Sequence, residues 1–339
     1  MAKLFSDFKI KGMELKNRIV MAPMCMYSAD GDGKPNNWHY THYTSRAVGG
    51  AGLIIFEATG VESRGRISDK DLGLWSDEHV DGLKQIVEAC QKHGAKVAVQ
   101  LGHAGRKSEV TSELSIAPSP VPFSEKYRVP VEMTIEDIKQ VQIAFREAAR
   151  RANLAGFDAI ELHGAHGYLI NQFLSPLTNK RTDEFGGSTE NRSRFLKEIL
   201  CEIRKVWPEV KPVIIRVSAE EYSENGNHPE GVAGILNFLK ADGIDMINVS
   251  SGGVINANMD IFPGYQVKFA EVVKSETGLP VIAGGLITSA LMAEEIIHNN
   301  RADLIYLGRE LLRNPYWPLQ AAKTLNSQLE WPVQYERAK

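Results

Sequence analysis

Two histidines and a tyrosine lie within six positions of one another in residues 159–176, AIELHGAHGYLINQFLSP. The imidazoles of His163 and His166 can each donate an N–H to a carbonyl or nitro oxygen and stabilise negative charge developing there. Tyr168, two residues further on, can supply a proton. Buried polar packing and a metal site are two alternatives that stay open at this point.

The spacing of these histidines does not favour a metal. No third ligand follows at a recognised distance, and the His-Glu-x-x-His pattern is absent. The three cysteines, Cys25, Cys90 and Cys201, are too few and too widely spaced for a Cys-rich metal site or a disulfide framework. We therefore expect no metal, and we expect Cys90 and Cys201 to be core residues of helices.

Length and composition indicate a globular chain. It has 339 residues, 43% of them hydrophobic and 24% charged, with a net charge of −3. This balance gives no reason to expect nucleic acid or an anionic membrane as a partner. The first twenty residues lack the apolar core of a signal peptide, and nowhere do 18 apolar residues run together. We expect a reduced, cytoplasmic, soluble protein.

Eight short, β-rich apolar runs, each followed by glycine or a polar residue, must position the histidines and their neighbours. They cover residues 18–23, 52–58, 96–102, 158–164, 212–218, 245–251, 280–285 and 303–309. Continuous apolar runs suit parallel strands that are covered on both faces. Helical patterns lie between them at 77–94, 134–156, 188–207, 231–243, 265–278, 288–300 and 314–326.

This alternation predicts an α/β fold, a (β/α)8 TIM barrel formed as a single domain by residues 1–339. The alternative is an open doubly wound sheet, but no Gly-x-Gly-x-x-Gly fingerprint follows the first strand. The connection after the third strand, 102–134, is long and contains four prolines. We expect it to be a lid over the barrel mouth.

The carboxyl ends of the strands are where such barrels carry their active sites, and they bear chemically useful residues here. Gly284, Gly285, Gly308 and Arg309 follow the last two strands, where barrel enzymes frequently bind phosphate. Gln100 and Arg216 end two other strands and suit a heterocycle that gains negative charge, such as a flavin. The alternative for Arg216 is an ion pair with Glu161. Cys25 follows the first strand, and we expect it at the cofactor.

Four segments together resemble the Old Yellow Enzyme family of FMN-dependent ene-reductases. They are NRIVMAPMCMYSADG, QLGHAGRK, ELHGAHGYLINQFLSPLTNKRTDEFGGSTENRSRF and ADLIYLGRELLRNP. The cysteine in PMCMY and the closing VQYER resemble its thermophilic-like bacterial branch. The resemblance covers essentially the whole chain, in order.

The resemblance implies a barrel with non-covalent FMN at the strand ends and NADPH or NADH as hydride donor. The implied cofactor-binding residues are Ala22, Pro23, Met24, Cys25, Ala58, Gln100, Arg216, Gly284, Gly285, Gly308 and Arg309. Cys25 would tune the redox potential of the flavin. Lys107 also lies in a family motif, and no role is assigned to it.

The same resemblance implies how a substrate is bound and reduced. His163 and His166, with Gly164 and Ala165 between them, would bind the activating oxygen of an α,β-unsaturated carbonyl or nitro compound. Tyr168 would protonate the α-carbon, and Tyr27 would contact the ligand from the other side. Arg337, in a C-terminal tail of about 326–339, would reach a neighbouring site in a homodimer or homotetramer. Detoxification of xenobiotics is the cellular role expected.

Two rival functions stay open on the sequence. A phosphate-binding aldolase or isomerase would need a Schiff-base lysine or a catalytic carboxylate, for which Lys107 and Glu57 are candidates. A non-catalytic flavin-binding protein would not need titratable residues at so many strand ends.

Overall fold

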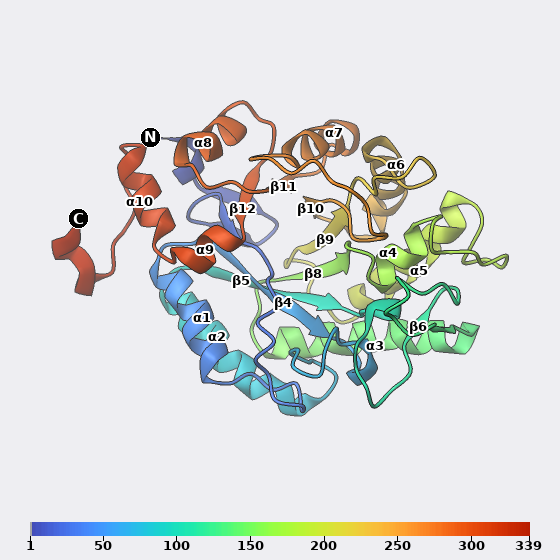
Figure 1. Ribbon diagram of the computed structural model, residues 1–339. Helices are drawn as coiled ribbons and strands as arrows, with labels where there is room; N and C mark the ends of the chain where they lie inside the picture. Colours follow the sequence, from blue (N-terminus) through green and yellow to red (C-terminus); the bar gives the residue numbers. More distant parts are fainter. Residues whose placement is uncertain (1) are drawn as a thin grey trace.

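Eight parallel strands close into a barrel in the computed structural model, which describes residues 2–339 (Figure 1). In order around the barrel they are β3 (Ile19–Met21), β4 (Leu53–Gly60), β5 (Lys96–Gly102), β8 (Ala159–Gly164), β9 (Val213–Ser218), β10 (Met246–Ser250), β11 (Val281–Ala283) and β12 (Leu304–Leu307). The last strand pairs with the first, with Ile305 beside Ile19. The (β/α)8 prediction is confirmed, and all eight predicted strands occur within three residues of the expected bounds.

Helices follow each strand and cover the outside of the barrel. They are α1 (Asn37–Val48), α2 (Val80–Lys92), α3 (Ile135–Leu154), α4 (Leu169–Leu174), α5 (Thr189–Arg204), α6 (Pro229–Leu239), α7 (Val267–Thr277), α8 (Ala290–His298), α9 (Arg309–Arg313) and α10 (Trp317–Thr324). The start of α3 is fixed by a capping box, because Thr134 and Asp137 bond reciprocally to each other's backbone N–H. Ser188 caps α5 in a similar way through its side chain.

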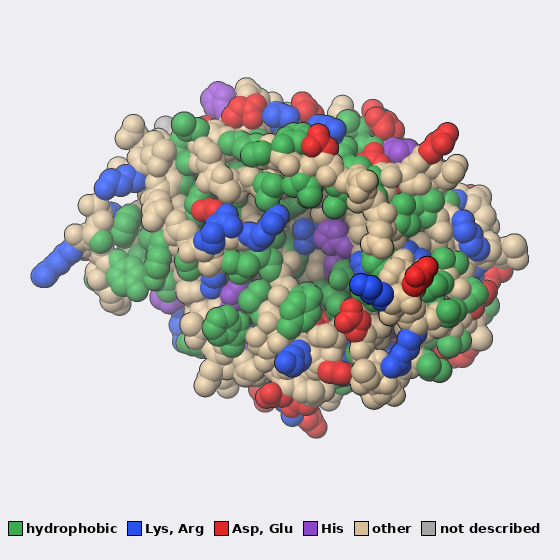
Figure 2. Space-filling model, in the orientation of Figure 1, with side chains coloured by type: hydrophobic (Ala, Val, Ile, Leu, Met, Phe, Trp, Pro, Cys, Tyr) green, Lys and Arg blue, Asp and Glu red, His purple; other side chains and the backbone are tan. Residues whose placement is uncertain are grey.

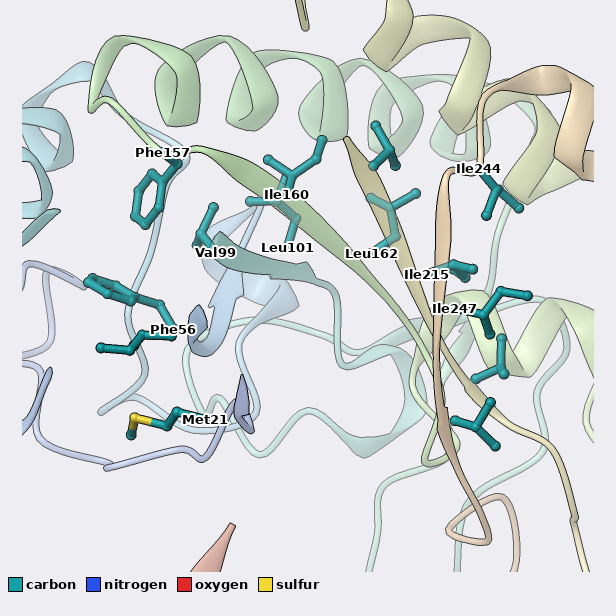
Figure 3. Packing of buried hydrophobic residues seen from close by; sticks show 14 of the residues in the cluster. Met21, Phe56, Val99, Leu101, Phe157, Ile160, Leu162, Ile215, Ile244 and Ile247 are labelled. Atoms are coloured by element: carbon teal, nitrogen blue, oxygen red, sulfur yellow. The ribbon is translucent and has the colours of Figure 1, made fainter. Parts of the chain in front are cut away.

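Alternation along the strands separates two apolar layers. Val99 and Leu101 of β5 and Ile160 and Leu162 of β8 point outward into a large cluster with the helices, part of which is drawn in Figure 3. A smaller cluster fills the barrel interior and includes the two-stranded hairpin β1 (Phe8–Ile10) and β2 (Met13–Leu15). The two layers bury both faces of the sheet, which is why its strands are continuously apolar.

Inward-facing residues change from apolar to polar along each strand. On β8 the inward series is Ala159, Glu161 and His163, since its alternate residues face the helices. On β9 it begins with Ile214 and Arg216. The barrel floor is therefore apolar, and the polar groups gather toward the carboxyl ends of the strands.

One helix was not located in the sequence, and one expectation is wrong. Helix α1 has no counterpart among the predicted helices, because its buried face consists of His39, His42, Tyr43, Arg46 and Ala47 and therefore carries no apolar periodicity. Cys201 was expected in the core, but it lies on the exposed side of α5, whereas Cys90 is buried as expected. The expected lid between β5 and α3 contains only a helical turn and the short strands β6 (Ile116–Ala117) and β7 (Val131–Glu132).

Candidate active site

The loop that follows β8 brings the two histidines and the tyrosine together. The ring of His163 lies 5.2 Å from that of His166 and 4.7 Å from that of Tyr168, edge to face in both cases. His166 has a φ of +58°, a left-handed conformation that costs energy for a residue with a side chain. Tyr168 is the residue that begins α4. Residues in such conformations cluster at functional sites, and this loop is the candidate site.

Hydrogen bonds leave one ring nitrogen of each histidine free. The N–H of Ala165 lies 3.4 Å from Nδ1 of His163, so this nitrogen is the acceptor and Nε2 carries the proton. Nε2 of His166 lies 2.7 Å from the hydroxyl of Ser250, which leaves its Nδ1 free. Burial lowers both pKa values far below the usual range, followed by His166 in the case of His163 and by the positive charges of Arg216 and Lys107 in both cases. Both imidazoles are therefore neutral.

Close backbone contact holds this loop against the loop after β10. Gly167 has a φ of +71°, and a Cβ there would lie 2.3 Å from the carbonyl oxygen of Gly253. The side chain of Asn171 accepts the N–H of Gly167 at 2.8 Å, and Gln172 donates to its carbonyl at 2.7 Å. The glycines of the motifs His-Gly-Tyr and Ser-Gly-Gly are thus needed for the approach of the two loops.

Arg216 is a buried cation whose Nε has no hydrogen-bond partner within residues 2–339. Glu161, its expected alternative partner, accepts amide N–H groups from Gln100 and Asn248 at 2.7 Å each. Arg216 and Glu161 do not come within ion-pair distance of each other in residues 2–339, although the charge of Arg216 opposes the rise that burial causes in the pKa of Glu161. Its guanidinium lies 5.3 Å from the ring centroid of Tyr306. The ion-pair alternative is therefore wrong.

A hollow of about 170 Å³ connects Arg216 with the ends of β11 and β12. Gly285, Gly308 and Arg309 line it, as the phosphate prediction requires. Gly284 does not line it, and its lack of a side chain makes room instead for the ring of Tyr306, which a Cβ would approach to 2.3 Å. The lining also includes Ser250 and Gln266, of which only Ser250 stood at a predicted strand end.

The segment after β3 runs along the end of β12. The N–H of Ala22 bonds the carbonyl of Leu307 at 3.0 Å, and Met24 lies against Gly308. Pro23 lies between them and Cys25 follows, half-buried. Burial, and then the charges of Asp71 and Glu57, raise the pKa of Cys25 far above its usual range. Cys25 is therefore a neutral thiol.

A β-bulge in β4 gives the consecutive residues Glu57 and Ala58 different surroundings. The pairing with β5 shifts between Phe56 and Ala58, so that Ala58 stands beside Gln100. Glu57 is fully buried and bonds the hydroxyl of Tyr43 in α1 at 3.0 Å and the N–H of Met26 at 2.8 Å. Because of the bulge, Ala58 lies at the mouth of the barrel, whereas the carboxylate of Glu57 is buried and holds the segment that carries Cys25.

The mouth between these groups is lined by Ala58, His103, His163 and Tyr168 among others. In Figure 2 histidine atoms, in purple, lie in the hollow near the middle of the face, with lysine and arginine atoms, in blue, beside them. Tyr27 is half exposed and has a φ of +50°, and burial followed by the neighbouring Cys25 raises its pKa to about 12. Arg337 is not brought to this site by its own chain, because it lies exposed in the C-terminal turn Val333–Ala338.

Residues 3–328 match the NADH:flavin oxidoreductase / NADH oxidase family. The chain belongs to this family, which includes Old Yellow Enzyme. It is 56% identical over 337 residues to NADPH dehydrogenase of Clostridium acetobutylicum, covering 99% of each chain. It is 51% identical to NADPH dehydrogenase of Bacillus subtilis, covering 99% of this chain and 98% of the relative. The solved structure of morphinone reductase has a TM-score of 0.82 at 29% identity, over 97% of this chain and 91% of the other.

Family membership makes this protein a flavin-dependent oxidoreductase whose cofactor is FMN, as the resemblance implied. The structure fits that cofactor, because Arg216 is a buried cation whose Nε has no hydrogen-bond partner in residues 2–339 and because Gly285, Gly308 and Arg309 line a hollow. The cation suits an anionic ring, and the hollow suits a phosphate. Membership of an oxidoreductase family also decides against the two rival functions, the aldolase or isomerase and the non-catalytic flavin-binding protein. Within residues 2–339 no helix is both long and apolar enough to cross a membrane, and no three His, Cys, Asp or Glu side chains gather as metal ligands.

Proposed function

We propose that this protein reduces the activated C=C bond of α,β-unsaturated carbonyl and nitro compounds, with NADPH or NADH as hydride donor. The observation that carries the proposal is the β8 loop, where two neutral imidazoles and one tyrosine lie ring against ring and His163 and Tyr168 line the mouth. The relatives named NADPH dehydrogenase and the neighbour named morphinone reductase support a reductase of this kind.

The histidines act on the substrate oxygen. Nε2 of His163 and Nδ1 of His166 are the ring nitrogens that the hydrogen bonds leave free, and in this proposal both carry a proton, with the hydroxyl of Ser250 donating to Nε2 of His166. Because both rings are neutral, they can donate hydrogen bonds to the oxygen without protonating it. Negative charge develops on that oxygen when a hydride reaches the β-carbon, and fixed donors in a buried site stabilise such charge strongly.

Tyr168 supplies the proton for the α-carbon. Burial, and then the nearby Cys25 and Tyr27, raise the pKa of Tyr168 far above its usual range. The phenol therefore keeps its proton until the electron-rich α-carbon takes it. Bound FMN would supply the chemistry of hydride transfer between the nicotinamide and the substrate.

A substitution of one histidine tests this assignment. In stopped-flow experiments on the holoenzyme, His163→Ala should slow oxidation of the reduced enzyme by 2-cyclohexenone roughly 100-fold or more, since one oxyanion donor is commonly worth that much. Reduction by NADPH should change by less than about tenfold, because the lost donor serves the substrate oxygen. His298→Ala, an exposed histidine on α8, is the matched control and should change neither rate. Equal effects of His163→Ala on both half-reactions would contradict the assignment.

A further inference from the structure

Lys107 belongs to the motif Gly-His-Ala-Gly-Arg-Lys after β5 and is not used in the reaction proposed above. Its ammonium donates to the carbonyl of His166 at 3.0 Å and to that of Gly253 at 3.2 Å. Both of these residues have a positive φ, +58° and +86°. One side chain thus joins the loop after β5 to the loops after β8 and β10, at the point where both backbones are left-handed.

The same ammonium lies between two aromatic rings. It is 4.3 Å from the ring centroid of Phe123 in the lid and 5.1 Å from that of Tyr168. Within residues 2–339, no other lysine or arginine lies over the ring of Tyr168. The neighbouring Arg106 is committed elsewhere, because its guanidinium donates to the carbonyls of Val121 and Val254. Lys107 is therefore the cation available to Tyr168.

Proton donation leaves a negative charge on Tyr168 that a nearby cation can stabilise. When the α-carbon takes the proton, its electron pair forms the new C–H bond, and the electrons of the broken O–H bond stay on the tyrosine as a phenolate. Water then returns a proton to this oxygen. The groups that raise the pKa of Tyr168 after burial are Cys25, Tyr27, Asp71 and Tyr127, none of which carries positive charge. A phenolate among them is costly unless a cation lies close.

We propose that Lys107 is a positioning residue whose positive charge stabilises the phenolate of Tyr168 while its N–H groups hold the backbone of His166. The proposal rests on the proposed function, because it assumes that Tyr168 is the proton donor. The negative charge of a phenolate is shared between its oxygen and its ring, and the centroid of that ring lies 5.1 Å from the ammonium. In a partly buried site, an attraction over such a separation is strong enough to change a rate roughly 100-fold.

The two roles of Lys107 can be separated by pH. A neutral amine still has two N–H donors for the carbonyls of His166 and Gly253, so deprotonation removes the charge and leaves the hold on the loop. Burial, and then the charge of Arg106, lower the pKa of Lys107 to about 8. Below that pH the lysine is charged, so proton donation should be fast there and should slow as the pH rises through about 8.

Other titratable groups around Lys107 come from two connections. The connection 102–134, to which Lys107 itself belongs, supplies Arg106, Glu109 and Tyr127, and the β8 loop supplies His163, His166 and Tyr168. The part of the β10 loop that Lys107 contacts supplies none. The two histidines are already neutral at pH 7, and the pKa values of Tyr127 and Tyr168 are raised. A fall in rate near pH 8 therefore points to Lys107.

The test is the pH dependence of enone reduction by the reduced holoenzyme, measured by stopped flow with 2-cyclohexenone from pH 6 to 9.5. The wild-type rate should fall through a pKa near 8. Lys107→Arg should keep the charge and move the fall to a higher pH, whereas Lys107→Met should be slower by roughly 100-fold at pH 7 and show no fall near pH 8. Lys126→Met, an exposed lid lysine, is the control and should match wild type.

Each outcome decides one question. If Lys107→Met keeps the wild-type fall near pH 8, or reduces the enone at the wild-type rate, the inference is wrong. If all three Lys107 forms give one flat profile and differ only in rate, the lysine only holds the loop and the charge role is wrong. Tyr168→Phe distinguishes this failure from that of the proposed function. An unchanged rate of enone reduction in that variant would show that Tyr168 is not the proton donor, so the proposed function would fail together with the inference.

Discussion

At the scale of single residues, Arg216 is a buried side chain whose hydrogen-bonding groups are not all satisfied by the described chain. It is 7% exposed, and its Nε has no hydrogen-bond partner in the described chain. A buried charge that lacks hydrogen-bond partners costs desolvation energy, and replacing it by an apolar side chain can be stabilising. Arg216 is thus explained by the anionic cofactor of the family and not by the stability of the barrel.

Replacing this residue should separate stability from cofactor binding. Arg216→Met should raise the unfolding free energy of the apoprotein by about 1–4 kcal/mol. The same change should weaken FMN binding by about tenfold or more, because a charged donor is lost. Chemical unfolding of the apoprotein and a fluorescence titration with FMN measure the two effects.

Arg181 is the matched control, since it is also buried but has partners. It donates to the carbonyls of Pro118 and Met133 and pairs with Asp183. Arg181→Met should lower the stability of apoprotein and holoenzyme alike, by about 3 kcal/mol, and leave FMN affinity nearly unchanged. A loss of apoprotein stability in Arg216→Met as large as this would show that Arg216 has a structural role.

At the scale of elements, the β8 loop depends on a contact that only glycine allows. Gly167→Ala combines a positive φ with a clash against the carbonyl of Gly253, and should cost about 3 kcal/mol or more. Gly187 also has a positive φ, +77°, but no atom would lie within 4 Å of a Cβ added there. Gly187→Ala should therefore cost only about 1 kcal/mol. Urea unfolding measures both, and equal losses would mean that the contact between the two loops is unimportant.

The strands were predictable from the sequence, whereas some elements between them were not. Strands that are buried on both faces consist of continuous apolar residues, which can be recognised in the sequence. The polar residues that follow them then indicate which residues lie at the mouth of the barrel. Helix α1 was missed because its buried face is built from histidines, a tyrosine and an arginine that bond inside the protein. The bulge at Glu57 and the orientation of Gly284 toward Tyr306 also leave no mark in a single sequence, because both depend on partners distant in the chain.

At the scale of the whole molecule, the C-terminal tail is the part that its own barrel covers least. Val333 is 81% exposed and Tyr335 is 41% exposed, and Arg337 lies beside them. Figure 1 shows this end of the chain, in red, extending away from the barrel. Exposed apolar side chains on an extended tail suit contact with a second copy of the chain. We therefore propose that Arg337 completes the site of a neighbouring subunit.

Mixing two inactive variants tests that proposal. Arg337→Ala alone and His163→Ala alone should each reduce enones slowly. In a mixed dimer, however, an Arg337→Ala subunit would keep His163 and receive Arg337 from its partner. After subunit exchange, random pairing should restore about a quarter of the wild-type activity. Activity no greater than the sum of the two separate variants would mean that each chain completes its own site.

The pairing of β12 with β3 has a consequence for synthesis of the protein. Residues 19–21 cannot gain their second neighbouring strand until residues 304–307 have left the ribosome, so most of the chain is made while the sheet still has two open edges. Such distant pairing slows folding and leaves strand edges available for aggregation. Nascent chains that stop before β12 should therefore be protease-sensitive and should depend on chaperones, even though nearly all of the residues around the mouth have already been made.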